Sequence, residues 1–180
     1  MPKNGSVFKF SISDLDRIFG QSRSDQDKKA KEVEFLKTKF QKWGLPETAT
    51  VELGSDTLAV IITDQDSTQM LVEWAEKLGT ILKSLQLTTA QIRNIFGTVR
   101  QIEMSWTPKD TEGERRDAMR RLLLLKPRLA YQSKRVEAVK WLEKVLAAAI
   151  DNVDFSRGNF QRFVDFFEAI LAYHTAAGGQ

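Results

Sequence analysis

The sequence predicts an all-α protein, a compact helical bundle of about five or six helices, with one possible short β-hairpin at residues 49–63. Apolar residues recur at intervals of three and four along most of the chain, as one face of a helix requires. Residues that begin or end helices stand between these periodic segments. With 42% apolar residues over 180 positions, the chain can bury the core of one domain, or of one domain with an appendage.

The first part of the sequence divides into two segments. Residues 1–23 mix glycine and serine with a few aromatic residues, and we expect them to form a flexible N-terminal arm or a docking segment. Residues 24–67 are expected to form an N-terminal helix followed by the possible hairpin. Ser24 can cap this helix and Gly44 can end it, and its apolar face consists of Val33, Leu36, Phe40 and Trp43.

The possible hairpin rests on a change of period at residues 49–63. Apolar side chains alternate with other residues on both sides of Gly54 and Ser55, at Val51, Leu53, Leu58, Val60 and Ile62. A period of two around a Gly-Ser pair is typical of two strands joined by a turn. Because an isolated hairpin is only marginally stable, this one should pack against the helices or be disordered.

Residues 68–179 are expected to form a helical domain. Its first helix runs from about Ser67 to Ser84, with an apolar stripe that faces a core. A capping box marks the start of the second helix, because the side chains of Thr88 and Gln91 can satisfy each other's backbone donors.

Three further helices complete the predicted domain. The first runs from Arg115 to Lys126, after a polar linker, and Pro127 should then kink or restart the chain. The other two are expected at residues 136–150 and 160–175, where apolar side chains again follow a helical period. The domain would therefore consist of helices alone.

Composition argues against several classes of enzyme. The sequence has no cysteine and a single histidine, His174, which excludes disulfides and thiol nucleophiles and disfavours most zinc chemistry. Asp165 and Glu168 can share a helix face, but His174 lies about 240° further round the helix than Glu168, so the three do not converge. We expect no catalytic residue, no metal site and no cofactor, and His174 should be a surface histidine near a helix end.

No segment of the sequence predicts a membrane location. No run approaches the roughly 18 apolar residues of a membrane span. The first residues also lack the apolar region of a secretory signal. We therefore expect a cytoplasmic protein with no membrane partner.

Positive charge is concentrated in the middle of the sequence. The net charge is only +3, but residues 88–135 hold 11 lysine and arginine residues against 5 acidic ones. Within this region, Arg120 to Tyr131 places four cations around four consecutive leucines, Leu122 to Leu125. Consecutive leucines need a partner surface, whereas cations stay solvated or meet an anion. This stretch is therefore expected to be a buried helix turn with a positively charged edge, which favours a polyanionic partner.

Three blocks of sequence, in this order, resemble one known family. Residues 87–94 are similar to the helix start, and residues 125–131 to the central motif, of the small subunit of type III-A CRISPR effector complexes, the Csm complex. The third block resembles the C-terminal helix of that subunit, at Phe163, Phe166, Glu168, Ala169, Ile170, Ala172, Tyr173, His174 and Gly178. Together the blocks cover about residues 68–179, and they do not explain residues 1–67.

The resemblance implies a helical subunit that assembles in several copies along a ribonucleoprotein. Its partners would be guide RNA and target RNA, other subunits of the Csm complex and copies of itself. Because nucleolytic chemistry in this family belongs to other subunits, the resemblance also implies a non-catalytic chain. Such a subunit contacts RNA backbones, since base pairing between guide and target reads the sequence.

Arginine suits this task because its planar fork of donors matches phosphate oxygens. The candidate RNA-binding residues are Arg93, Arg100, Arg120, Arg121, Lys126, Arg128, Lys134 and Arg135. Each could instead be an ordinary solvated helix cation, and Lys126 could neutralise the C-terminal end of a helix dipole. The aromatic residues are expected to fill the core more often than to stack on bases, and Tyr131, beside the basic block, is the least certain of them.

Two other functions remain open. The chain could be a helical protein-interaction adaptor whose basic face contacts acidic protein surfaces. It could also be a small enzyme, which the missing nucleophiles and metal clusters disfavour.

Overall fold

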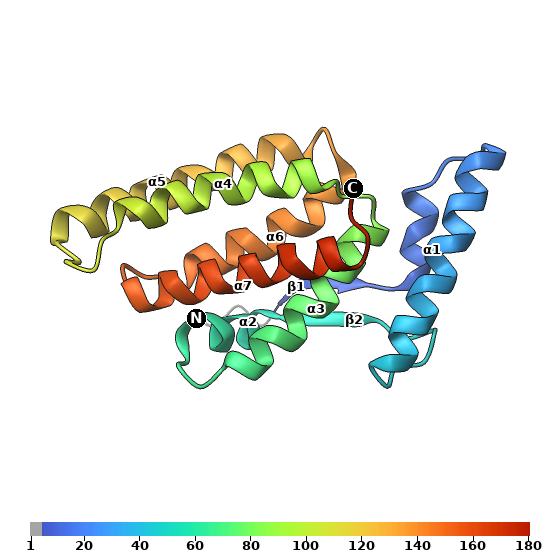
Figure 1. Cartoon of the computed structure of the whole chain (residues 1–180), viewed down its shortest axis with the longest axis horizontal. Coiled ribbons are helices and arrows are strands. Elements are labelled where there is room, and N and C mark those ends of the chain that lie inside the picture. Colours follow the sequence, from blue (N-terminus) through green and yellow to red (C-terminus); the bar gives the residue numbers. More distant parts are fainter. Residues whose placement is uncertain (1–4) are drawn as a thin grey trace.

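The computed structural model describes residues 5–180 and consists mainly of helices (Figure 1). This part of the chain forms seven α-helices, one 3-10 helix and a two-stranded antiparallel sheet, so the largely helical prediction is confirmed and the expected number of helices was too low. The elements are β1 (Ser6–Phe10), η1 (Ile12–Arg17), α1 (Arg23–Lys42), β2 (Val51–Gly54), α2 (Ser55–Thr63), α3 (Thr68–Ser84), α4 (Thr89–Ser105), α5 (Glu112–Ser133), α6 (Glu137–Asp151) and α7 (Arg157–Ala176).

The centre of the fold is the contact between α3 and α7. Gly79 of α3 permits it, because a Cβ atom at this position would lie only 2.5 Å from the carbonyl oxygen of Ile170. Aromatic side chains extend the core from α7 toward α4, with the ring of Phe167 edge-on to Phe96 and that of Phe160 stacked on Trp106. The two helices therefore approach each other to backbone contact, and the remaining helices pack around them.

The predicted hairpin at residues 49–63 is wrong in its second half. Val51–Gly54 does form a strand, but its partner is Ser6–Phe10, and Ser55–Thr63 is the helix α2. The apolar residues of this segment also fit a helical period, since Leu58, Ile61 and Ile62 are buried on one face. The alternative period of two placed Val60 in the core, whereas 39% of this residue is exposed.

Part of the segment expected as an arm or a docking segment, residues 1–23, packs against the helices. Phe8 and Phe10 of β1 are buried, and both rings lie edge-on to Trp141 of α6, with centroids 5.5 and 5.8 Å apart. Leu15 of η1 is also fully buried. Residues 1–4 lie outside the described residues. From Ser6 to Arg17, the structure thus shows a docked segment.

Helix α5 is longer than the sequence predicted. It begins at Glu112 instead of Arg115, because Thr111 and Glu114 form a capping box, and it passes through Pro127 without ending. A proline inside a helix removes one backbone hydrogen bond and costs about 3 kcal/mol. Buried leucines on the same face on both sides of Pro127, Leu125 and Leu129, offset that cost.

His174 is buried, which corrects the expectation of a surface histidine. Its ring lies beneath Gly179, and its Nε2 atom is 2.6 Å from the carbonyl oxygen of Leu87. A carbonyl oxygen only accepts, so Nε2 carries the proton and Nδ1 does not. Burial lowers the pKa of His174 below its usual value; the hydrogen bond to Leu87 acts against this shift, and the nearby charge of Lys83 adds to it. The neutral imidazole is therefore a structural link between α7 and the segment just before α4.

Candidate nucleic-acid interface

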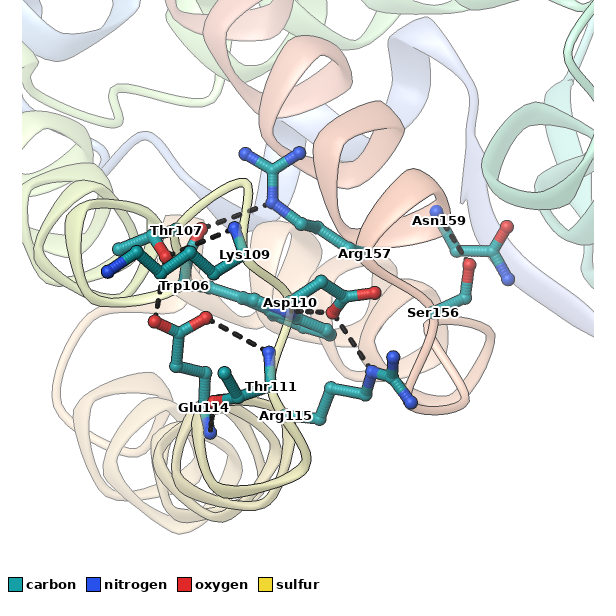
Figure 2. A network of polar contacts seen from close by, with 10 residues as sticks. All are labelled: Trp106, Thr107, Lys109, Asp110, Thr111, Glu114, Arg115, Ser156, Arg157 and Asn159. Carbon is teal, nitrogen blue, oxygen red and sulfur yellow. Dashed lines mark hydrogen bonds and ion pairs between the residues drawn. The ribbon is translucent and has the colours of Figure 1, made fainter.

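The candidate cations lie on α4, α5 and the turn after α5, and a polar network at the α4–α5 connection positions the two helices (Figure 2). The indole nitrogen of Trp106 donates to Asp110 at 2.7 Å, and Nε of Arg115 donates to the same oxygen atom at 3.0 Å. Nε of Arg157, at the start of α7, donates to the backbone carbonyl of Trp106 at 3.2 Å. The hydrogen bonds from Arg115 and Trp106 hold the pKa of Asp110 below its usual value, so its carboxylate stays charged.

The four consecutive leucines of α5 divide between two faces. Leu122 and Leu125 are buried in the core, as the sequence indicated, whereas Leu123 and Leu124 are 46% and 50% exposed. Successive residues of a helix point about 100° apart, so four in a row cannot all face one core. The turn is therefore only half buried, and its outer half places apolar surface among the cations.

Three candidate cations already have partners in the chain. Arg100 forms an ion pair with Glu103, one turn later on α4. Lys126 pairs with Asp151 of α6 at 2.6 Å, and Arg121 donates to the hydroxyl of Ser105 at 3.0 Å, which links α5 to α4. An RNA phosphate would have to compete with these contacts. These three residues are therefore weaker candidates than the sequence suggested.

The other candidates are exposed at the ends and outer faces of the two helices. Within residues 5–180, no hydrogen bond or ion pair involves the side chains of Arg93, Arg120, Arg128 or Lys134. Arg120 projects from the side of α5 opposite its buried residues, and Arg128, eight residues later, lies about 80° further round the helix, where it is also exposed. Helices α4 and α5, which carry most of these cations, lie side by side along one edge of the molecule (Figure 1). Guanidinium groups without an acidic neighbour can accept phosphates at little cost.

One groove gathers two of these cations near the C-terminal end of α5. Its lining consists of Pro127, Arg128, Tyr131, Gln132 and Arg135. The guanidinium of Arg135 lies over the Tyr131 ring, 4.7 Å from its centroid, and Tyr131 is 59% exposed. Sequence reasoning left Tyr131 and Gln132 out of the candidate site. A partial signal was present, because Tyr131 follows Arg128 by three residues, a spacing that makes two side chains neighbours on a helix, whereas Arg135 reaches Tyr131 from the turn after α5.

A second groove lies between β1 and α6. Four cations and the Trp141 ring border it, but Asp14 and Glu137 line it as well. These carboxylates pair with two of the cations, Arg17 at 3.3 Å and Lys140 at 2.7 Å. The positive charge of this groove is thus partly neutralised. The groove at the C-terminal end of α5 is therefore the more suitable one for an anion.

Among residues 5–180, no three His, Cys, Asp or Glu side chains are grouped so that they could hold a metal ion. In the same part of the chain, no helix is both long enough and apolar enough to span a membrane. The candidate interface therefore consists of cations, one exposed aromatic ring and exposed leucines.

The comparisons with known proteins agree with the resemblance seen in the sequence. A family model described as Csm2 Type III-A matches residues 65–180, which is more than half of the chain. Searches of curated proteins and of solved structures gave no significant match. The matched segment comprises α3 to α7 and carries every candidate cation, while the N-terminal elements β1 to α2 precede it. The chain therefore belongs to the Csm2 family, the small subunit of type III-A CRISPR effector complexes.

Proposed function

We propose that this chain binds the backbones of guide and target RNA through the outer faces of α4 and α5. In this proposal, several copies line up along the effector complex, and each contributes one basic surface. In this proposal the chain supplies no catalytic group of its own, and its single histidine is buried, where it links α7 to the segment before α4. The observation that carries the proposal is the set of exposed cations on α4 and α5 that lack an acidic partner in the described structure.

The same surface supports contacts with other subunits. Leu123, Leu124 and Met104 are exposed, and Met104 has 79% of its surface accessible. Exposed apolar side chains can be buried when a protein partner covers them. We propose that these residues face neighbouring copies or other Csm subunits. This is also the observation that favours the adaptor function, in which the cations would contact acidic protein surfaces instead of RNA.

The decisive experiment neutralises the two unpaired arginines on the outer face of α5. We expect Arg120→Gln with Arg128→Gln to weaken RNA binding, because each arginine binds a phosphate. The dependence of log affinity on log salt should flatten by about 0.7 for each phosphate of a single strand that the variant no longer neutralises. Lys126 is left unchanged, since its replacement would also break the ion pair with Asp151. Both the free chain and the assembled complex should be measured, because avidity in the complex can mask weaker binding by each copy.

The matched control removes the same charge from outside the family-matched region. Lys28 and Lys31 of α1 are exposed, and neither forms an ion pair within residues 5–180. The Lys28→Gln and Lys31→Gln double variant should keep the wild-type affinity and salt dependence. Equally weakened binding in both double variants would show that net charge alone attracts RNA. If the α5 variant binds RNA normally but no longer joins the other subunits, the adaptor function is the better one.

A further inference from the structure

The exposed Tyr131 ring has no structural role in the core, unlike most aromatic side chains of the protein. Other large aromatic side chains, such as Trp106, Phe160 and Phe163, are buried. Tyr131 instead stands on the outer face of α5 near its C-terminal end, and 59% of it is exposed. An exposed aromatic ring buries a large apolar area when a flat ligand covers it.

The residues around the Tyr131 ring favour one orientation of the ring and favour a negatively charged ligand. Arg135 covers the ring at 4.7 Å from the centroid, which holds the phenol in place before any ligand arrives. The other groove residues are Pro127, whose ring is rigid, Arg128, and Gln132, whose amide both donates and accepts. No carboxylate among residues 5–180 lines this groove, and it carries two positive charges. It therefore suits a ligand that is flat, carries hydrogen-bonding edges and is attached to an anion.

We infer that the groove formed by Pro127, Arg128, Tyr131, Gln132 and Arg135 binds an unpaired nucleobase of RNA, stacked on the face of Tyr131 that Arg135 does not cover, with the adjoining phosphates held by the two arginines. A base inside a duplex is covered on both faces by its neighbours and cannot stack on a protein ring. The ligand is therefore a base of a single-stranded segment or one displaced from a duplex. Gln132 can hydrogen-bond to the edge of any base, so the groove accepts bases without selecting their sequence.

This inference rests on the proposed RNA binding and adds an interaction that phosphate binding does not require. Stacking does not depend on salt as ion pairing does, which separates the two contributions. Loss of the ring should therefore lower affinity for single-stranded RNA about tenfold and leave the salt dependence unchanged. Affinity for a fully paired duplex of equal length should stay the same, since a duplex offers no free base.

The experiment compares Tyr131→Leu, which keeps an apolar side chain, with Tyr131→Trp, which keeps an aromatic ring. The full chain is titrated with a single-stranded RNA carrying 2-aminopurine and with the paired duplex. We expect the leucine variant to lose affinity for the single strand only, and the tryptophan variant to retain it with quenched indole fluorescence. Phe155→Leu is the matched control, because Phe155 is 51% exposed but lies beyond the opposite end of α6, and it should have no effect.

Three outcomes would overturn the inference. If Tyr131→Leu retains wild-type affinity while wild type binds RNA with the expected salt dependence, the groove holds no base and the proposed function stands. If single-stranded and paired RNA weaken equally, Tyr131 supports the arginines and does not stack. If RNA affinity is unchanged but the variant fails to join the other subunits, the groove is a protein-docking site. Failure of the wild-type chain to bind either RNA, free or in the complex, would instead reject the proposed function together with the inference.

Discussion

Helices α1 and α7 have the same length, 20 residues, and differ in what holds them to the molecule. In α7, seven side chains are buried, five of them in a run from Phe160 to Phe167. In α1, only Leu36 and Phe40 are buried, and most of its surface is charged. Since buried apolar area is the main stabilising contribution in folding, α7 should be the more stable of the two.

Polar contacts contribute more to the attachment of α1 than to that of α7. Glu32 accepts hydrogen bonds from Lys83 of α3 at 2.9 Å and from the hydroxyl of Ser84 at 2.8 Å. The Lys83 ammonium also lies 4.3 Å from the centroid of the Phe35 ring. In Figure 1, α1 stands at one end of the molecule, opposite the α4–α5 connection. The family-matched bundle is thus held by packing, whereas the helix that precedes it is held by few apolar contacts and a partly buried ion pair.

The largest expected effect tests the packing of α7 directly. Gly79→Ala should destabilise the protein by about 2–3 kcal/mol, because the added methyl group would lie 2.5 Å from the Ile170 carbonyl oxygen and 2.7 Å from the His174 backbone nitrogen. Backbone atoms cannot move aside as a flexible side chain can, so α3 and α7 would separate. The free energy of unfolding from urea titration measures the change.

Gly97→Ala provides the control for this substitution. Gly97 also lies inside a helix, α4, but a Cβ atom there would have no atom within 4 Å apart from its chain neighbours and the backbone of its own helix. Alanine at this position should stabilise the protein by about 0.5–1 kcal/mol, because it restricts the unfolded chain and favours the helix. If both alanine variants were stabilised, the α3–α7 contact would be looser than the structure shows.

The helices of the bundle were predictable from sequence for the same reason that they are stable. Periodic burial and capping, as at Thr88 and Gln91, are local patterns, and the structure contains this capping box. The pairing of β1 with β2 joins segments more than 40 residues apart, and no local pattern identifies that partner. Residues 55–63 fitted two periods, and only the packing of α2 decides between them.

A smaller effect on stability is expected when the ion pair that attaches α1 is removed. Glu32→Gln should weaken the docking of α1 by about 1–2 kcal/mol, because Lys83 would be left without its charged partner while remaining only 18% exposed. Hydrogen exchange should become faster in α1 and stay unchanged in α7, since α1 can open without unfolding the bundle.

Charge removal at the surface of α1 serves as the reference for that measurement. Glu34→Gln removes a carboxylate from an exposed position, 76% accessible, where its ion pair in the described part of the chain is with the partly exposed Lys37. We expect almost no change in exchange, because exposed ion pairs contribute little. Equal acceleration in α1 and α7 for Glu32→Gln would mean that the two helices unfold as one unit.

The candidate site was predictable only as far as helical phase determines exposure. Arg120 lies inside the predicted helix and projects outward as its position required, whereas Arg128 follows Pro127, where the predicted helix had already ended. The pairing of Lys126 with Asp151 depends on how α5 packs on α6, so the sequence alone could not show that this cation is occupied. The general tendency of aromatic residues to fill cores does not predict that Tyr131 is exposed. Its exposure follows from its position on the outer side of α5, which depends on how α5 packs.

The smallest effect concerns pH and again belongs to α7. His174 is the sole histidine of the sequence, and burial lowers its pKa in the folded state, so between that pKa and the ordinary value near 6.5 the unfolded chain binds more protons. The free energy of unfolding should therefore fall as pH is lowered below about 6.5, by at most about 1.4 kcal/mol per pH unit from this group. His174→Gln keeps a side-chain donor for the Leu87 carbonyl but cannot titrate. Its free energy of unfolding, measured by urea titration from pH 7.5 to 5.5, should decline less steeply than that of wild type. Parallel declines would show that the buried imidazole does not resist protonation, and that the link between α7 and the start of α4 tolerates a charge.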